Sequence, residues 1–364
     1  MKAPKIDILM KLVKTGKSPQ TGRVSYISDT TFKILLVGGV GVGKTSLIAS
    51  MKHQIDHFGL GGFFSALGET ADALTFQCDR MQKGLDGEIG DFRGIRGIEK
   101  SSDIYIYKFE IQANYDAPGK LLRFCFPVEI IDLPGGWYTE SYDSAHTHKD
   151  EIRSLLSEAI VSLVCVNTPS LMDGRPEVFA RFNSPTIVSG WYQNDAYLQK
   201  LKETGHKVIF VLSRCEKYRK QRLEMQERVK TAKCGYAGLI AGMSAMKIPV
   251  SLTYVETLGG VEFDQYDELG QNSWQEKYKI TGSYSPKNCE VPLILALRHA
   301  VESIHSTLET KNGDWLERLK IVFGLSQNDL AQIAISEINT KLQQLNLQEG
   351  EHYWSLTGNR KEKK

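Results

Sequence analysis

The chain has 364 residues, of which 41% are hydrophobic and 24% charged, so it has ample material for a folded core. Its formal net charge of +2 at pH 7 gives no strong field, which argues against binding to nucleic acid or to an acidic membrane surface. The six cysteines include no CxxC pair, so we expect no zinc site, and free thiols in a reducing compartment instead.

The first thirty residues are predicted to precede the main domain. We expect residues 1–30 to form a short helix followed by a linker, because the stretch 17–30 is polar and contains proline and glycine. Charges interrupt the apolar positions of MKAPKIDILMKLVKTGK, so this segment fits neither a signal peptide nor a membrane span. We therefore expect a cytoplasmic protein without stable membrane insertion.

From residue 32 onward, apolar runs of strand length alternate with helical patterns. Strands are expected at 32–38, 103–112, 121–132, 160–167, 206–213 and 248–256, and helices at 44–55, 148–159, 195–205, 220–243 (broken near Gly235) and 291–309. Continuous apolar strands that alternate with helices are typical of a parallel sheet covered on both faces. We therefore predict a three-layer α/β fold over residues 31–310, with a mostly parallel six-stranded sheet that has one antiparallel strand.

Beyond this domain, residues 311–350 contain helical patterns with apolar positions. We expect them to form a helical extension packed on the domain, with self-association as an alternative role. Residues 351–364 are expected to be a charged tail.

The stretch 38–45, GGVGVGKT, fits the P-loop pattern G-x-x-x-x-G-K-[ST] and lies between a predicted strand and a predicted helix. Glycines let backbone N–H groups converge on a phosphate at the positive end of that helix. Lys44 would reach the β- and γ-phosphates, and the Thr45 hydroxyl would bind Mg²⁺. Ser46 is counted with the nucleotide-binding residues, although the magnesium role does not need it. The other predicted loop contacts come from Gly38, Gly41, Val42 and Gly43.

A second magnesium ligand, this time a carboxylate, is expected at the end of another strand. The sequence VEIIDLPGG places Asp132 there, at the edge of the sheet where ligands bind in open α/β folds. Asp132 would hold magnesium through water, and the Gly135 N–H would meet the γ-phosphate. The spacing from Asp132 to Gly135 fits D-x-x-G.

Together, GGVGVGKT and DLPG resemble the motifs of Ras-like GTPases, the TRAFAC type of G domain. The resemblance covers roughly residues 32–310. The overall look, a G domain with altered base-reading motifs and a helical extension, is similar to prokaryotic GTPase-like proteins encoded in multi-gene signalling or defence systems. The resemblance implies a P-loop NTPase fold, GTP with Mg²⁺ as the ligand, and two base-reading motifs farther along the chain.

The resemblance implies that these base-reading motifs follow the last two strands. Residues 213–216 are S-R-C-E, where the family has N/T-K-x-D. Glu216 would accept hydrogen bonds from guanine, Arg214 would lie over the base, and Ser213 would brace the P-loop; an ordinary charged turn is the alternative. Thr257 and the backbone N–H of the next residue would approach the guanine carbonyl.

Hydrolysis in the family uses a glutamine directly after D-x-x-G, but this chain has Gly136 there, which implies slow turnover. His146 and His148 are candidates for orienting water, or they are solvated loop residues.

The long segment 56–102 corresponds to switch I of the family. Ser101 would supply the second magnesium hydroxyl, with Ser102, Thr70 and Thr75 as rivals. Arg96, or alternatively Arg93, would serve as an arginine finger in cis. The phenylalanines of GLGGFFSALG are expected either in the core or in a partner-binding patch.

Three functions remain open at this point. The first is a slow GTPase that acts as a switch for a protein partner, read through the switch loops or by self-association. The second is an ATP-using P-loop enzyme. The third is a nucleotide-binding scaffold that hardly turns over.

Overall fold

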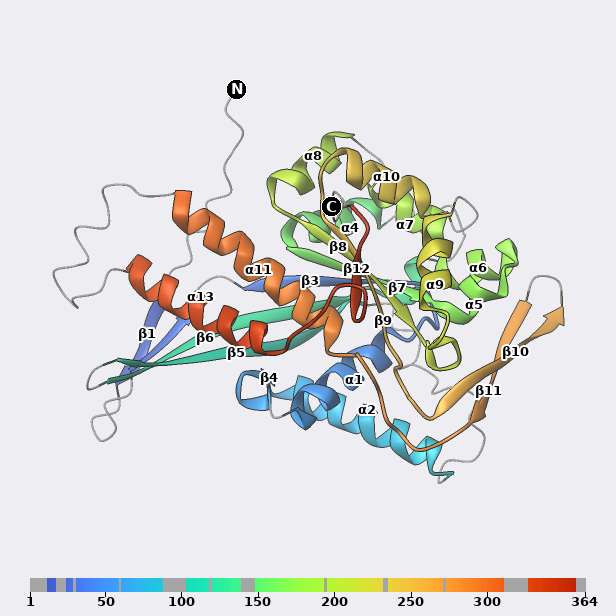
Figure 1. Ribbon diagram of the computed structural model, residues 1–364, viewed down its shortest axis with the longest axis horizontal. Helices are drawn as coiled ribbons and strands as arrows, with labels where there is room; N and C mark the ends of the chain where they lie inside the picture. Colours follow the sequence, from blue (N-terminus) through green and yellow to red (C-terminus); the bar gives the residue numbers. More distant parts are fainter. Residues whose placement is uncertain are drawn as a thin grey trace, which may run out of the picture.

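A mostly parallel β-sheet forms the centre of the computed structural model (Figure 1). The structure describes residues 12–17, 24–28, 31–58, 60–87, 103–117, 120–138, 148–192, 195–231, 235–270, 273–310 and 327–357. The six predicted strands lie side by side in the order β5 (Tyr105–Ala117), β6 (Lys120–Asp132), β3 (Phe32–Val37), β7 (Val161–Asn167), β8 (Lys207–Ser213) and β9 (Val250–Tyr254). Within this set β5 runs antiparallel to β6 and all other neighbours are parallel, which confirms the predicted fold class.

Helices cover both faces of the sheet, because successive residues of a buried strand point to opposite sides. On β3, Ile34 and Leu36 belong to one hydrophobic cluster, and Leu35 and Val37 to the other. The first cluster receives residues from α1 (Lys44–His57), α2 (Glu69–Leu85), α11 (Val291–Thr310) and α13 (Gln327–Gln344). The second receives residues from α4 (Lys149–Glu158), α5 (Thr168–Asp173), α6 (Pro176–Asn183), α7 (Pro185–Tyr192), α8 (Asp195–Glu203), α9 (Arg222–Lys230) and α10 (Ala237–Ala245).

In the described residues the sheet has ten strands rather than six, and two of the additional strands correct our expectation for the N-terminus. Instead of a helix and linker, β1 (Leu12–Lys17) and β2 (Val24–Ser28) form an antiparallel pair. β2 also pairs with the first half of β6, which extends beyond β3. Without β2, the first half of β6 would have an unpaired edge with free N–H and C=O groups. The sequence VSYIS of β2 favours a strand and pairs with this edge.

The C-terminal part also contributes to the sheet. The helix α13, from the predicted extension, packs against α11 and β5, while residues 311–326 of that extension lie outside the described residues. The segment expected to be a charged tail contains β12 (Tyr353–Ser355), which pairs antiparallel with β9. The ring of Trp354 lies 5.8 Å from the ring of Tyr254, so an aromatic contact anchors this edge. Residues 358–364 lie outside the described residues.

Several elements were not expected from the sequence. The segment 56–102 contains η1 (Leu60–Gly62), β4 (Phe64–Ala66), which pairs with β5, and the helix α2. Phe63 and Phe64 are buried, so they belong to the core rather than to a partner-binding patch. By contrast, the division of the predicted helix 220–243 into α9 and α10, with Gly235 between them, agrees with the break expected near that glycine.

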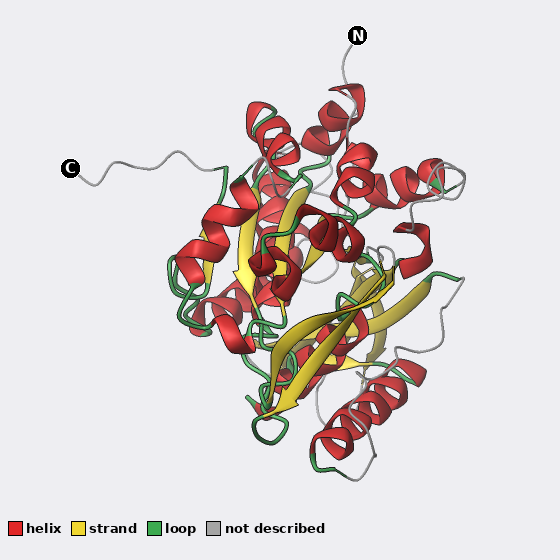
Figure 2. Cartoon of the chain, turned by 90° about the vertical axis from the view of Figure 1, so that its right-hand side faces the viewer, coloured by secondary structure: helices red, strands yellow, loops and turns green. Residues whose placement is uncertain are grey.

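The insertion between β9 and α11 forms a hairpin of β10 (Val261–Gly270) and β11 (Ser273–Ile280), a two-stranded sheet of its own. The hairpin lies beside the carboxyl ends of β7 and β8 and in the foreground of Figure 2. Within the described part of the chain, no helix is long and apolar enough to cross a membrane.

Candidate functional site

The loop between β3 and α1 has the backbone that the glycine pattern predicts. Gly41 and Gly43 adopt φ angles of 81° and 91°, a region that residues with a Cβ rarely enter. The helix α1 begins after Gly43 without a side-chain cap, and its first turn contains no acidic residue. Its first N–H groups and its positive dipole end therefore suit an anion.

Two opposite charges lie beside this loop. The Lys44 ammonium donates a hydrogen bond to the Gly38 carbonyl (2.7 Å) and lies 3.6 Å from Asp132 Oδ1. Asp132 Oδ1 is buried, and no hydrogen-bond donor reaches it from the described residues. Burial raises the pKa of Asp132, and the neighbouring Lys44 charge opposes the increase. A buried carboxylate oxygen without a donor fits a metal ion, directly or through water.

Tyr107, on β5, joins these residues and was not identified from the sequence. Burial and the charge of Asp132 raise the pKa of Tyr107, and a hydrogen bond with the Thr45 side chain lowers it by less. The two predicted magnesium residues, Thr45 and Asp132, therefore share a buried phenol as a neighbour. Ser46, one residue farther along α1, is half-buried.

The D-x-x-G segment packs directly on the loop. A Cβ added at Gly135, in η2 (Gly135–Tyr138), would lie only 2.9 Å from Val40 Cγ2 and 3.0 Å from Val40 Cα. A side chain is therefore excluded there. Nearby, Trp137 stacks on His148 with ring centroids 3.9 Å apart, so this histidine is neither fully solvated nor free to turn. His146 lies outside the described residues.

The end of β8 braces the loop from the other side, as predicted. Ser213 Oγ lies 2.7 Å from the Val42 carbonyl and 3.1 Å from the Val166 carbonyl and can donate to either. Arg214 has a φ of 59°, which is rare for a residue with a side chain. Its Nε lies 3.6 Å from the position of a Cβ on Gly43, so its side chain runs beside the phosphate loop.

The two predicted base-reading segments bind each other. Glu216, in η3 (Glu216–Tyr218), accepts hydrogen bonds at Oε1 from the backbone N–H groups of Leu258 (3.0 Å) and Gly259 (3.3 Å). Burial raises the pKa of Glu216, and these N–H groups oppose the increase. The Thr257 carbonyl accepts a hydrogen bond from Ser50 of α1 (2.7 Å). The structure thus brings Glu216 next to the two residues that follow Thr257.

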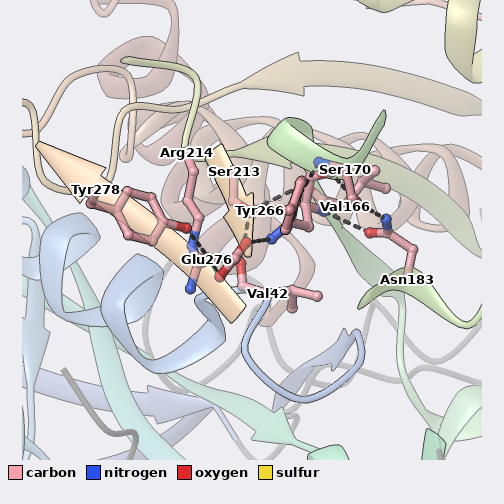
Figure 3. Close-up of polar contacts among 10 residues, drawn as sticks. Val42, Val166, Ser170, Asn183, Ser213, Arg214, Tyr266, Glu276 and Tyr278 are labelled. Carbon is pink, nitrogen blue, oxygen red and sulfur yellow. Dashed lines mark hydrogen bonds and ion pairs between the residues drawn. The ribbon is translucent and has the colours of Figure 1, made fainter. Parts of the chain in front are cut away.

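The hairpin β10–β11 supplies site residues that sequence reasoning missed (Figure 3). Glu276 forms an ion pair with Arg214 and accepts a hydrogen bond from Asn167 Nδ2 (2.7 Å). The Tyr278 hydroxyl also accepts from Arg214 (2.5 Å), and the Tyr266 hydroxyl donates to Asn167 Oδ1 (3.2 Å). The alternating residues of 261–280 around G-Q-N were a usable hairpin signal, but nothing in their spacing indicated this contact.

Thr70 and Thr75, the alternatives to Ser101 as the second hydroxyl ligand of magnesium, each form another hydrogen bond. Thr70 Oγ1 accepts a hydrogen bond from the Lys108 N–H (2.9 Å), and Thr75 Oγ1 donates to the Ala71 carbonyl within α2 (2.8 Å). The preferred candidates Ser101 and Arg96 lie outside the described residues, as do Ser102 and Arg93.

No protein-family model matches the chain, and no curated protein matches it. Among solved structures, it is similar to the GTPase-like domain of S. cerevisiae Ski7 bound to GTP, with 16% identity and a TM-score of 0.37. That match covers 74% of this chain and 50% of the Ski7 chain, so this chain spans half of that structure. The cytosolic domain of the T. maritima FeoB iron transporter, in its apo form, matches with 14% identity, a TM-score of 0.25 and 88% coverage of each chain. Because both TM-scores lie below 0.5, we base the function on the geometry of the chain itself.

Proposed function

We propose that the protein binds GTP with Mg²⁺, hydrolyses it slowly and acts as a nucleotide-dependent switch for a protein partner in the cytoplasm. The observation that carries this proposal is the convergence of three features on one point. They are the uncapped start of α1, the ammonium of Lys44 and the buried Oδ1 of Asp132. An anion and a divalent cation together satisfy all three.

Each residue has a defined task in this proposal. The N–H groups of residues 41–45 bind the phosphates, and Lys44 transfers its donor from the Gly38 carbonyl to them. Thr45 and Asp132 would hold Mg²⁺, which when bound neutralises charge that develops on the phosphates. Tyr107 stays protonated at neutral pH and keeps Thr45 oriented. Ser101 as a further magnesium ligand and Arg96 as a cis arginine finger belong to the same proposal.

Guanine recognition requires Glu216 to exchange partners. Its Oε1 accepts from two backbone N–H groups, and the Leu258 N–H is the donor proposed to meet the guanine carbonyl. A bound guanine has N–H donors for the Glu216 carboxylate and a carbonyl acceptor for the Leu258 N–H. Its binding would therefore replace the hydrogen bond between Leu258 and Glu216 by one hydrogen bond from guanine to Glu216 and one from Leu258 to guanine. Gly136, where a water-orienting glutamine would stand, supports slow turnover.

The switch role is supported by the contact between Gly135 and Val40, which joins the end of β6 to the phosphate loop. A γ-phosphate in the loop would change this contact, and a partner would recognise the change. A place in a multi-gene signalling or defence system is proposed by analogy alone.

The test is binding of ribose-labelled fluorescent GTP and ATP, with and without Mg²⁺, to the wild type and to Lys44→Ala. Lys52→Ala is the matched control, because Lys52 lies on the same helix and pairs with Asp56. We expect GTP to bind in preference to ATP, with a loss of about a hundredfold in Lys44→Ala and none in the control. Preference for ATP would replace the GTPase by an ATP-using enzyme, and binding without turnover would favour the scaffold.

A further inference from the structure

The side chain of Arg214 joins the hairpin β10–β11 to the phosphate loop. Arg214 lies beside Gly43 on one side, and it contacts Glu276 and Tyr278 of the hairpin on the other. Figure 3 shows these groups between the hairpin and the loop that contains Val42. The hairpin comes from the insertion that follows β9, so it is not needed to complete the sheet.

Glu276 is itself fixed by several elements. Its Oε1 accepts from Asn167 Nδ2, and Asn167 in turn receives the Tyr266 hydroxyl at its Oδ1 and caps α5 through the Ser170 N–H (2.9 Å). The backbone N–H of Asn167 donates to Asn183 Oδ1 (2.6 Å). The carboxylate that receives Arg214 therefore has little freedom, since a satisfied polar network of this kind is rigid.

The backbone conformation and the position of Arg214 are both energetically unfavourable. A left-handed backbone is unfavourable for a residue with a side chain, and such conformations persist only where their surroundings impose them. A cation beside the positive end of α1 is also unfavourable unless a counter-charge accompanies it. Glu276 supplies that counter-charge.

The position of Arg214 in the chain indicates which part of a ligand it meets. Ser213 touches the phosphate loop at Val42, and Glu216 touches the predicted base-reading loop at Leu258. Arg214 lies between these two contacts. Glu276 balances the charge of Arg214, and the ring centroid of Tyr278 lies 5.5 Å from its guanidinium carbon. Arg214 would therefore meet a ligand with its guanidinium plane rather than with a net charge, and a guanidinium plane stacks on aromatic rings.

We propose that Glu276 is a positioning residue that holds the guanidinium of Arg214 against the nucleoside part of the bound nucleotide. The inserted hairpin thus sets the affinity for the nucleoside without changing the affinity for the phosphates. This inference rests on the proposed nucleotide site.

The test compares two ligands by calorimetry: GTP with Mg²⁺, which has a nucleoside, and inorganic tripolyphosphate with Mg²⁺, which has none. In Glu276→Gln, we expect the affinity for GTP to fall about tenfold and the affinity for tripolyphosphate to stay at the wild-type value. Arg214→Ala should show the same pattern, and the double variant should lose no more than Arg214→Ala alone.

Two further variants keep the test sharp. Tyr278→Phe removes one hydroxyl contact and keeps the ring, so it should show a smaller loss in the same direction. Asp267→Asn is the matched control, because Asp267 lies on the same hairpin and pairs with Lys277 instead; its GTP affinity should not change. Thermal melting of each variant shows whether it is folded.

Three results would overturn the inference. The first is wild-type GTP affinity in Glu276→Gln, the second is equal loss of both ligands, and the third is additive loss in the double variant. If the wild type binds neither ligand, the nucleotide site itself fails, and the inference fails with it. If the wild type binds both ligands and the variants do not discriminate, only the role of Glu276 fails.

Discussion

The proposed nucleotide site has a phosphate end, formed by the loop between β3 and α1 with Asp132, and a base end, formed by residues 213–216 and 257–259. At the phosphate end, Asp132 Oδ1 has no hydrogen-bond donor among the described residues, whereas at the base end Glu216 Oε1 accepts from two backbone N–H groups. Arg214, also at the base end, is held by Glu276 and Tyr278. Removing a polar group at the phosphate end should therefore impair binding and leave stability nearly intact. Substitutions at the base end should also reduce stability, because they break contacts that the protein makes with itself.

The largest effect is expected from a methyl group at the phosphate end. In Gly135→Ala, the new Cβ would meet the backbone of Val40, so the loop must shift. Overpacking of about 1–3 kcal/mol would lower the affinity for GTP with Mg²⁺ roughly tenfold to a hundredfold. Gly136→Ala is the control, since among the described residues other than its chain neighbours no heavy atom lies within 4 Å of a Cβ at that position. Equal affinities of the two variants would contradict the packing of Gly135 on the loop.

The next effect is one of stability at the base end. Glu216→Ala leaves the backbone N–H groups of Leu258 and Gly259 without their acceptor, so the free energy of unfolding should fall by about 2 kcal/mol. Urea unfolding measures this change. Glu216→Gln keeps an oxygen at the same distance and should lose less. A Glu216→Ala variant as stable as the wild type would remove the contrast between the two ends.

A third, smaller effect concerns the stability contribution of two buried histidines that lie away from both ends of the site. This contribution depends on pH, so it must be taken into account when nucleotide binding is measured in acid. His206 Nδ1–H donates to the Ala159 carbonyl, its Nε2 contacts Ser162 Oγ, and His299 Nε2–H donates to the Gly205 carbonyl. Burial lowers the pKa of each histidine to about 4. The neutral form is thus favoured in the folded state, and its contribution is present above pH 6.5 and is lost as the pH falls toward 4.

We therefore expect the free energy of unfolding to decrease by roughly 1 kcal/mol per histidine between pH 7 and pH 6, measured by urea unfolding at each pH. Imidazole NMR signals that titrate near pH 6.5 would contradict the buried, neutral assignment. His206→Gln should reduce the acid-dependent loss.

The smallest effect is expected on the stability of Asp132→Asn. Because burial raises the pKa of Asp132, protonation is favoured in the folded state and the stabilising contribution is lost as the pH rises through the folded pKa. At pH 7 the Lys44 ammonium, 3.6 Å away, offsets part of the cost of burying the carboxylate. In the neutral asparagine variant Lys44 loses this partner but keeps its hydrogen bond to the Gly38 carbonyl, and the desolvation cost of the carboxylate is removed, so the free energy of unfolding should change by less than about 1 kcal/mol. The same variant should lose the Mg²⁺ dependence of GTP binding. A loss of stability as large as that of Glu216→Ala would erase the difference between the two ends.

The sequence alone predicted the local structure of the loop between β3 and α1. Its residues are consecutive, from Gly38 to Thr45, and the left-handed glycines, the strand before and the helix after are all local properties. Asp132 was found because the carboxyl ends of parallel strands meet at one edge of a sheet. The central six strands and their helical layers followed from hydrophobic periodicity in the same way.

Only the tertiary structure decided what surrounds that core. The strands β1, β2 and β12 form because the edges of β6 and β9 are free to be paired, which is a property of the assembled sheet and not of the segments VSYIS and YWS. The contacts of Arg214 with Glu276 and Tyr278 join residues more than sixty positions apart. Side-chain periodicity reports whether a residue faces the core, but it carries no information about which distant polar group lies opposite, because that depends on how whole elements pack.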